Sequence, residues 1–95
     1  MKVVLEAEAL DDLDGIHAWI ARDNPEAADS TTERIYDEIE HLGRLPHLGH
    51  QGRARGTLEW VVTASSHIVV YTIDDERDEL IVAGVFRGSQ QFRRS

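Results

Sequence analysis

Four side chains in the second half of the chain could take part in proton transfer or charge stabilisation: Glu59, His67, Tyr71 and Arg87. A carboxylate or an imidazole can act as a general base, a phenol or an imidazole as a general acid, and an arginine as a fixed positive charge beside a developing anion. Each also has a structural interpretation. Glu59 could face solvent or pair with a nearby arginine. His67 could simply begin a strand, and Tyr71 could be a core residue with its hydroxyl at the surface.

A second group of residues could bind an anionic partner. Arg53 and Arg55 lie in a glycine-rich segment and could hold a carboxylate or a phosphate; the alternative is two solvated loop arginines. Arg87 ends an apolar run, where a charge is costly unless it faces a cleft, a partner or solvent. Arg93 and Arg94 continue the positive charge to the C-terminus. The sequence therefore predicts a partner-binding surface formed by these five arginines.

Three histidines, His41, His47 and His50, lie close together in the sequence. No fixed element would hold them, and no acidic residue stands beside them at ligand spacing. The sequence therefore predicts neither a metal site nor a cofactor.

The net charge of −8 is distributed unevenly along the chain. Residues 1–40 hold twelve carboxylates and three basic side chains, a net charge of −9, whereas residues 41–95 hold six carboxylates and seven arginines, a net charge of +1. Binding of nucleic acid along its backbone needs a concentrated positive field. The composition thus argues against a general nucleic-acid coat and leaves room for one small basic face.

The chain length of 95 residues predicts one domain, residues 1–95, that buries roughly 60 to 65% of the surface exposed by its unfolded chain. The absence of cysteine excludes disulfides and thiolate metal sites and is compatible with a reducing cytoplasm. The first residues lack a basic segment followed by an apolar h-region, so we expect no signal peptide, and the apolar runs are too short to cross a bilayer. We therefore expect a cytoplasmic protein that does not associate with membranes.

The first half of the chain predicts a short strand and two helices. Residues 2–5 are apolar and β-branched, as in a strand. A helix from about residue 8 to residue 22 follows, with apolar side chains at three- and four-residue spacing: Leu10, Leu13, Ile16 and Ile20. Asn24 and Pro25 begin a second helix, as an N-cap and a first-turn proline, and Gly43 ends it. The inward stripe of this helix consists of Ala28, Thr32, Ile35, Ile39 and Leu42.

The second half predicts three strands, at residues 57–63, 67–73 and 79–86. Their connections are short, so they form an antiparallel meander. The aliphatic stripes of the two helices need one continuous apolar surface. We therefore predict an α+β fold, with an N-terminal strand and a two-helix hairpin packed on an antiparallel sheet in the order β-α-α-β-β-β. The connection from Gly43 to Gly56 is long for a domain of this size, which suggests a functional loop.

Three sequence motifs together carry a family resemblance: RLPHLGHQGRARGTLEWVV, HIVVYTID and VFRGSQQF. In this order and spacing they resemble the RelE/ParE superfamily of toxins, over nearly the whole chain. The matching positions of the first motif are Arg44, Pro46, Gly49, Gly52, Arg53, Gly56, Thr57 and Glu59. The matching positions of the other two motifs are Ile68 to Tyr71, Val85, Gly88 and Gln90.

The resemblance implies a small toxin of a type II toxin–antitoxin system of the plasmid-stabilisation branch. Such a toxin is neutralised in a hetero-oligomer by a cognate antitoxin that wraps its surface. Two activities occur in the superfamily. Some members are ribonucleases that cut messenger RNA in the ribosome, and others are non-enzymatic inhibitors that trap DNA gyrase on cleaved DNA.

The residues of this chain favour gyrase inhibition. RNA cleavage without a metal needs a base for the 2′-hydroxyl, cations for the phosphorane-like transition state and an acid for the leaving oxygen. Ribonuclease members tend to carry a cation in the third strand and histidine, tyrosine or several lysines near the end. Here the third strand holds Ile68 to Val70, Arg87 stands where the family usually carries histidine, and Lys2 is the only lysine. Arginine is a poor proton shuttle because it stays charged.

Two alternatives remain open at this stage. A ribosome-dependent endoribonuclease would draw its catalytic residues from Arg87, Glu59, Tyr71 and His67. A degenerate toxin that has kept only antitoxin binding would agree with the acidic net charge and with the lost histidine.

Overall fold

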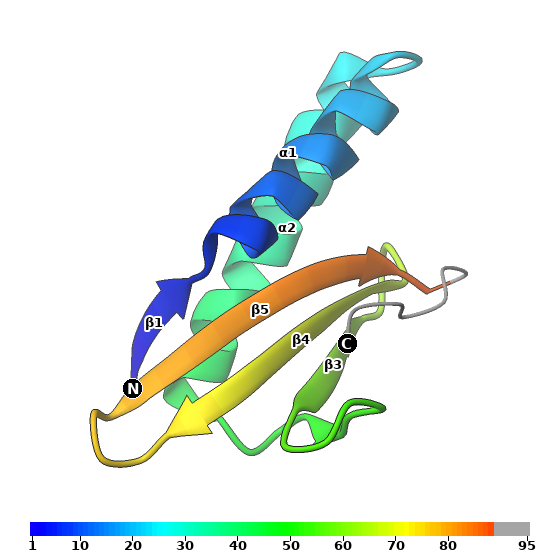
Figure 1. Cartoon of the computed structure of the whole chain (residues 1–95). Coiled ribbons are helices and arrows are strands. Elements are labelled where there is room, and N and C mark those ends of the chain that lie inside the picture. The colour runs from blue at the N-terminus through cyan, green and yellow to red at the C-terminus, as the bar shows by residue number, and fades with distance from the viewer. Residues whose placement is uncertain (89–95) are drawn as a thin grey trace.

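A computed structural model describes residues 1–88 as a five-stranded sheet with a hairpin of two helices on one face (Figure 1). The elements are β1 (Lys2–Leu5), α1 (Ala7–Ala21), α2 (Pro25–Arg44), β2 (His50–Gln51), β3 (Leu58–Val62), β4 (His67–Asp74) and β5 (Glu79–Arg87). The predicted α+β fold is confirmed. Within residues 1–88, no helix combines the length and apolar character needed to cross a membrane.

The strands lie in the order β1-β5-β4-β3-β2. β3, β4 and β5 form the predicted antiparallel meander. β1 adds to its edge in parallel with β5, with Val3 opposite Leu80 and Leu5 opposite Val82, so the complete sheet is mixed. A two-residue strand, β2, pairs with β3 inside the long loop. Neither pairing could be inferred from periodicity, because both depend on where distant segments meet.

A bulge in β5 keeps its apolar side chains on the helix side. Val69 of β4 lies opposite Val85, but Tyr71 lies opposite Val82, which leaves one extra residue on β5. Such an insertion lets two residues on one strand oppose one on the other. All four side chains therefore belong to the core beneath the helices.

The buried side chains confirm the stripe predicted for α2 and correct the one predicted for α1 at a single position, Leu10. Ile35, Ile39 and Leu42 are almost completely buried, and the Asn24 side chain accepts a hydrogen bond of 3.1 Å from the Ala27 N–H, as expected of an N-cap. On α1, by contrast, Leu10 is 43% exposed. The predicted positions Leu13 and Ile16 do face the core, where Leu13 is buried and Ile16 packs at the margin. The buried residue of the first turn is Ala9, next to Leu10.

Gly43 does not end α2 in a left-handed conformation, because the helix continues through Arg44. Its lack of a side chain serves packing. A Cβ at this position would lie 2.8 Å from Cγ2 of Val3, and the Gly43 carbonyl accepts a 2.8 Å hydrogen bond from the N-terminal amine. This glycine therefore allows β1 to approach α2.

Candidate functional site

The long loop after α2 is fastened to the sheet by Tyr71. The Tyr71 hydroxyl donates a 2.7 Å hydrogen bond to the carbonyl of Pro46 and accepts a 3.0 Å hydrogen bond from the N–H of Gly49. A Cβ on Gly49 would lie 2.5 Å from that hydroxyl. Tyr71 itself is fully buried, and this burial raises the pKa of its hydroxyl, an effect that the Gly49 N–H partly offsets. Tyr71 thus remains a protonated structural donor.

Glu59 fastens the second part of the same loop. Its carboxylate accepts a 2.8 Å hydrogen bond from the backbone N–H of Arg53, and Nε of Arg53 lies 3.4 Å from the same oxygen. The Glu59 side chain is only 6% exposed. The predicted pairing with a nearby arginine is therefore what the structure contains, and the carboxylate is occupied by the loop.

The last residues of the motif RLPHLGHQGRARGT close the tip of the loop. The N–H of Gly52 donates to the Thr57 carbonyl at 2.8 Å, and the Thr57 hydroxyl donates to the Ala54 carbonyl at 2.6 Å. Gly56 has φ of +80°, a conformation that side chains disfavour. Part of the motif that carries the family resemblance therefore has a structural role in closing this loop.

His67 and Glu59 lie on opposite faces of the sheet. Residues directly across from one another share a face, and faces alternate along each strand. His67 is opposite the core residue Val62, whereas Glu59 is opposite Val70, on the face away from the helices. Tyr71 faces the helices but lies four residues along β4 from His67, about 13 Å. The four candidate catalytic residues therefore do not converge on one point.

His67 begins β4, as predicted, and is 6% exposed. It lies opposite Arg87 of β5. Its Nδ1 is buried and makes no hydrogen bond within residues 1–88. Burial, and secondarily the positive charge of Arg87, lower the pKa of His67 below its ordinary value of 6.5. The imidazole is therefore neutral at pH 7.

The lowered pKa of His67 predicts a loss of stability in acid. The unfolded chain takes up a proton at His67 near pH 6.5, before the folded chain does, so this contribution is complete above about pH 6.5 and declines as the pH falls toward the folded pKa. Urea unfolding of wild type should show a steeper decline from neutral to mildly acid pH than unfolding of His67→Gln. Equal declines in the two proteins would mean that His67 titrates normally.

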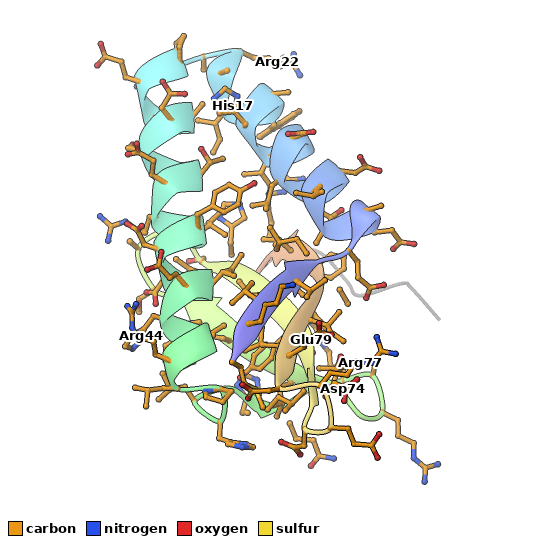
Figure 2. All side chains as sticks on the ribbon, turned by 90° about the vertical axis from the view of Figure 1, so that its left-hand side faces the viewer. His17, Arg22, Arg44, Asp74, Arg77 and Glu79 are labelled. Carbon is orange, nitrogen blue, oxygen red and sulfur yellow. The ribbon has the colours of Figure 1, made fainter. Side chains whose placement is uncertain are left out.

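Arg87, the strongest functional candidate from the sequence, is exposed and lies against α1. Its guanidinium carbon is 5.3 Å from the centre of the Trp19 ring, and that of Arg22 is 5.1 Å from the same centre. Both distances fall in the range of cation–π contacts. Trp19 is itself 56% exposed. Arg22 marks the end of the helix hairpin that projects past the sheet (Figure 2).

A groove of about 520 Å³ lies between α1 and the C-terminal part of β5, and we call it the α1 groove. The helix contributes Asp11, Asp12, Gly15, Ile16, Trp19 and Ile20. The strands contribute His67, Val85, Phe86 and Arg87. Figure 1 shows that α1 and β5 leave the β1 end of the molecule in diverging directions. The volume of the groove lies in the range of ligand sites.

The contributions of α1 to this groove could not be predicted from the sequence. Asp12 Oδ2 accepts a 2.9 Å hydrogen bond from the Val85 N–H, a contact between residues 73 positions apart that no local pattern could reveal. Trp19 and Arg22 are three residues apart on α1, a spacing that places them on the same side of a helix. That pair was the one local signal available.

The other predicted partner-binding residues are dispersed. Arg55 is exposed on the loop, and Arg53 is held at Glu59. Arg93 and Arg94 lie outside the described residues. No group of three or more potential metal ligands occurs within residues 1–88.

The sequence is similar to a known protein family and to a known protein. Residues 3–92 match the family described as ParE toxin of type II toxin–antitoxin system, parDE. The Y4kP protein of Sinorhizobium fredii (strain NBRC 101917 / NGR234) is 35% identical over 74 residues, which cover 78% of this chain and 77% of that protein.

Solved structures share the same arrangement of elements. A chain of the chromosomal ParDE system from P. aeruginosa has a TM-score of 0.79 at 17% identity, over 92% of this chain and 95% of its own. A chain of the intact E. coli RelBE toxin–antitoxin complex has a TM-score of 0.68 at 13% identity, over 94% and 98%. The YoeB/ParE toxin from Agrobacterium tumefaciens has a TM-score of 0.63 at 25% identity, over 92% and 98%. The family match, which spans all but the ends of the sequence, shows that this chain belongs to the ParE toxin family of type II toxin–antitoxin systems.

Proposed function

We propose that this chain is a non-enzymatic toxin that traps DNA gyrase on cleaved DNA and is neutralised by a cognate antitoxin. The observation that carries the proposal is the dispersal of its candidate acid–base residues. Glu59 is engaged by Arg53, Tyr71 is buried against the loop, and neither is near His67. A ribonuclease needs a base and an acid on either side of one phosphate. An inhibitor that acts by binding needs only a surface.

The antitoxin partner is supported by the relatives. Structures with this fold include the ParDE system from P. aeruginosa and the RelBE complex from E. coli, whose names describe toxin–antitoxin assemblies. By analogy, the chain would work in the cytoplasm, where gyrase and DNA are found, as one half of a plasmid-stabilisation pair. Arg55 and Arg87, both exposed, are the described arginines that we assign to partner binding.

Ribosome-dependent RNA cleavage is the second candidate function, and one observation favours it. His67 and Arg87 are directly opposite on β4 and β5 and both line the α1 groove. This pair could supply a base and a cation, and the carboxylates of Asp11 and Asp12 line the same groove.

Expression of the chain without an antitoxin distinguishes these functions. We expect growth arrest with gyrase covalently attached to broken chromosomal DNA, before any loss of messenger RNA. Cleavage of messenger RNA ahead of DNA breaks would reject the proposal in favour of a ribonuclease. Normal growth at a verified level of folded protein would indicate a degenerate toxin.

Arg55 provides a test of the antitoxin surface. Arg55→Glu should weaken the complex with the antitoxin about tenfold, because it replaces an attractive charge with a repulsive one at an exposed position. The corresponding change at Arg53 is less suitable, since a glutamate there would meet Glu59. Arg77→Glu, in the turn between β4 and β5 (Figure 2), is the matched control. Equal affinities of the two variants in titration calorimetry would place the interface away from the loop.

A further inference from the structure

A second, smaller hollow lies between α2 and the turn that joins β3 to β4 (Figure 1). On the helix it is lined by Ser30, Thr31 and Arg34, whose spacings of three and four residues place them on one side of α2. On the turn it is lined by Ala64 and Ser65. None of these residues lines the α1 groove, so the hollow is a separate feature of the surface.

The hydroxyl oxygen of Ser65 is buried at this hollow and has no hydrogen-bond partner within residues 1–88. The turn that carries it is held in place, because the N–H groups of Ser65 and Ser66 both donate to the Val62 carbonyl, at 3.2 and 2.8 Å. Buried polar atoms in proteins almost always have a partner, and an unsatisfied one costs stability. This hydroxyl therefore indicates that a polar group of a bound molecule completes the hollow.

Arg34 is the only charged side chain among the described residues that line the hollow. It is exposed, and neither Arg34 nor Thr31 uses its side chain in a hydrogen bond or an ion pair within residues 1–88. A guanidinium offers several donors together with a full positive charge, and a hydroxyl offers a donor that rotates to suit its partner. Donors on both sides of the hollow therefore favour an anion that presents oxygen atoms in more than one direction.

We propose that this hollow binds one phosphate group, with Arg34 pairing with its charge and the hydroxyls of Thr31 and Ser65 donating to its oxygens. The volume of about 80 Å³ exceeds that of a single water, about 30 Å³, and suits a small tetrahedral oxyanion. Arginine and hydroxyl side chains are common contacts of phosphate oxygens, and the bonds from arginine are among the stronger ones. The phosphate group belongs either to a nucleic-acid backbone, as a diester, or to a nucleotide or free phosphate.

An NMR titration of the full chain with inorganic phosphate, at an ionic strength kept constant with chloride, tests the proposal. The amides of Ala64 and Ser65 should shift with a dissociation constant on the order of 1 to 10 mM, as expected of one charge-assisted and two neutral hydrogen bonds. Arg34→Gln should weaken binding about tenfold or more. Ser65→Ala should weaken it about fivefold, yet without phosphate it should be as stable as wild type or more stable, since it removes an unsatisfied buried oxygen.

Arg44→Gln is the matched control. Arg44 lies ten residues further along the same helix and pairs with Glu40, so its loss removes the same charge from α2 and should leave phosphate binding unchanged (Figure 2). The proposal is overturned if the Ala64 and Ser65 amides do not shift, if the two glutamine variants weaken binding equally, or if acetate binds as tightly as phosphate. A loss of stability in Ser65→Ala without phosphate would also overturn it, by showing that the hydroxyl already has a partner in the chain.

Three further probes distinguish the sources of the phosphate group. A nucleoside monophosphate carries a monoester, a dinucleoside monophosphate carries one diester, and a plain nucleoside carries neither. Shifts of the Ala64 and Ser65 amides with the diester would identify a contact to a nucleic-acid backbone, and shifts with the monoester alone would identify a nucleotide or free phosphate. Equal shifts with the plain nucleoside would contradict the proposal, because the sugar or the base would then be the bound group. These titrations need no toxicity, so their failure leaves gyrase trapping untouched.

Discussion

Ile35→Ala is expected to lower the free energy of unfolding by about 2 to 5 kcal/mol, the cost of removing a large aliphatic side chain from a packed core. Ile35 is completely buried in the middle of α2 and belongs to the cluster that joins both helices to the sheet. Urea denaturation monitored by circular dichroism gives the value directly.

Leu10→Ala is the control for this prediction. Leu10 belongs to the stripe predicted for α1 from the sequence but is 43% exposed. Its truncation should cost about 1 kcal/mol or less. Similar losses for the two variants would show that α1 is rotated from the orientation described above, and a loss below about 0.5 kcal/mol for Ile35→Ala would show that its stripe is not core.

Tyr71→Phe is expected to cost about 1 to 3 kcal/mol and to release the loop after α2. The change leaves the Pro46 carbonyl and the Gly49 N–H without the buried hydroxyl that now joins them. Trypsin should then cleave after Arg53 and Arg55 faster than in wild type, because a released loop enters a protease site more readily.

Tyr36→Phe makes the same chemical change at an exposed position of α2 and serves as the control. It should alter stability by no more than about 0.5 kcal/mol and leave the cleavage rate unchanged. If Tyr71→Phe behaves like Tyr36→Phe, the hydroxyl does not hold the loop, and Tyr71 becomes available for a role in chemistry.

The parts of the fold that local rules determine could be predicted from the sequence. The N-cap at Asn24, the buried stripe of α2 and the short turns of the meander all depend on residues a few positions apart. The pairing of Glu59 with Arg53, six residues away, was available to the same reasoning. Parallel addition of β1 beside β5 was not, because it joins residues almost eighty positions apart and leaves no periodic signal.

The candidate site was predicted only on its sheet side. His67 and Arg87 were each candidates from the sequence, but no local pattern placed them together. They meet because two antiparallel strands place them opposite each other. The contributions of α1 depend on the angle between the hairpin and the sheet, which no residue pattern determines. Gly43 illustrates the same limit. A glycine near a helix end suggests a C-cap, but here it makes room for Val3.

We propose that this ParE-family chain acts by trapping gyrase, and two parallel assays of the purified protein can decide this. Wild type and Arg87→Ala are incubated with gyrase and supercoiled DNA and, separately, with ribosomes that carry messenger RNA. We predict that wild type accumulates gyrase-linked DNA breaks, that Arg87→Ala does so less, and that the messenger remains intact with both proteins. Specific cleavage of the messenger by wild type, abolished in Arg87→Ala, would contradict gyrase trapping. Inactivity in both assays would identify a degenerate toxin that has kept only antitoxin binding.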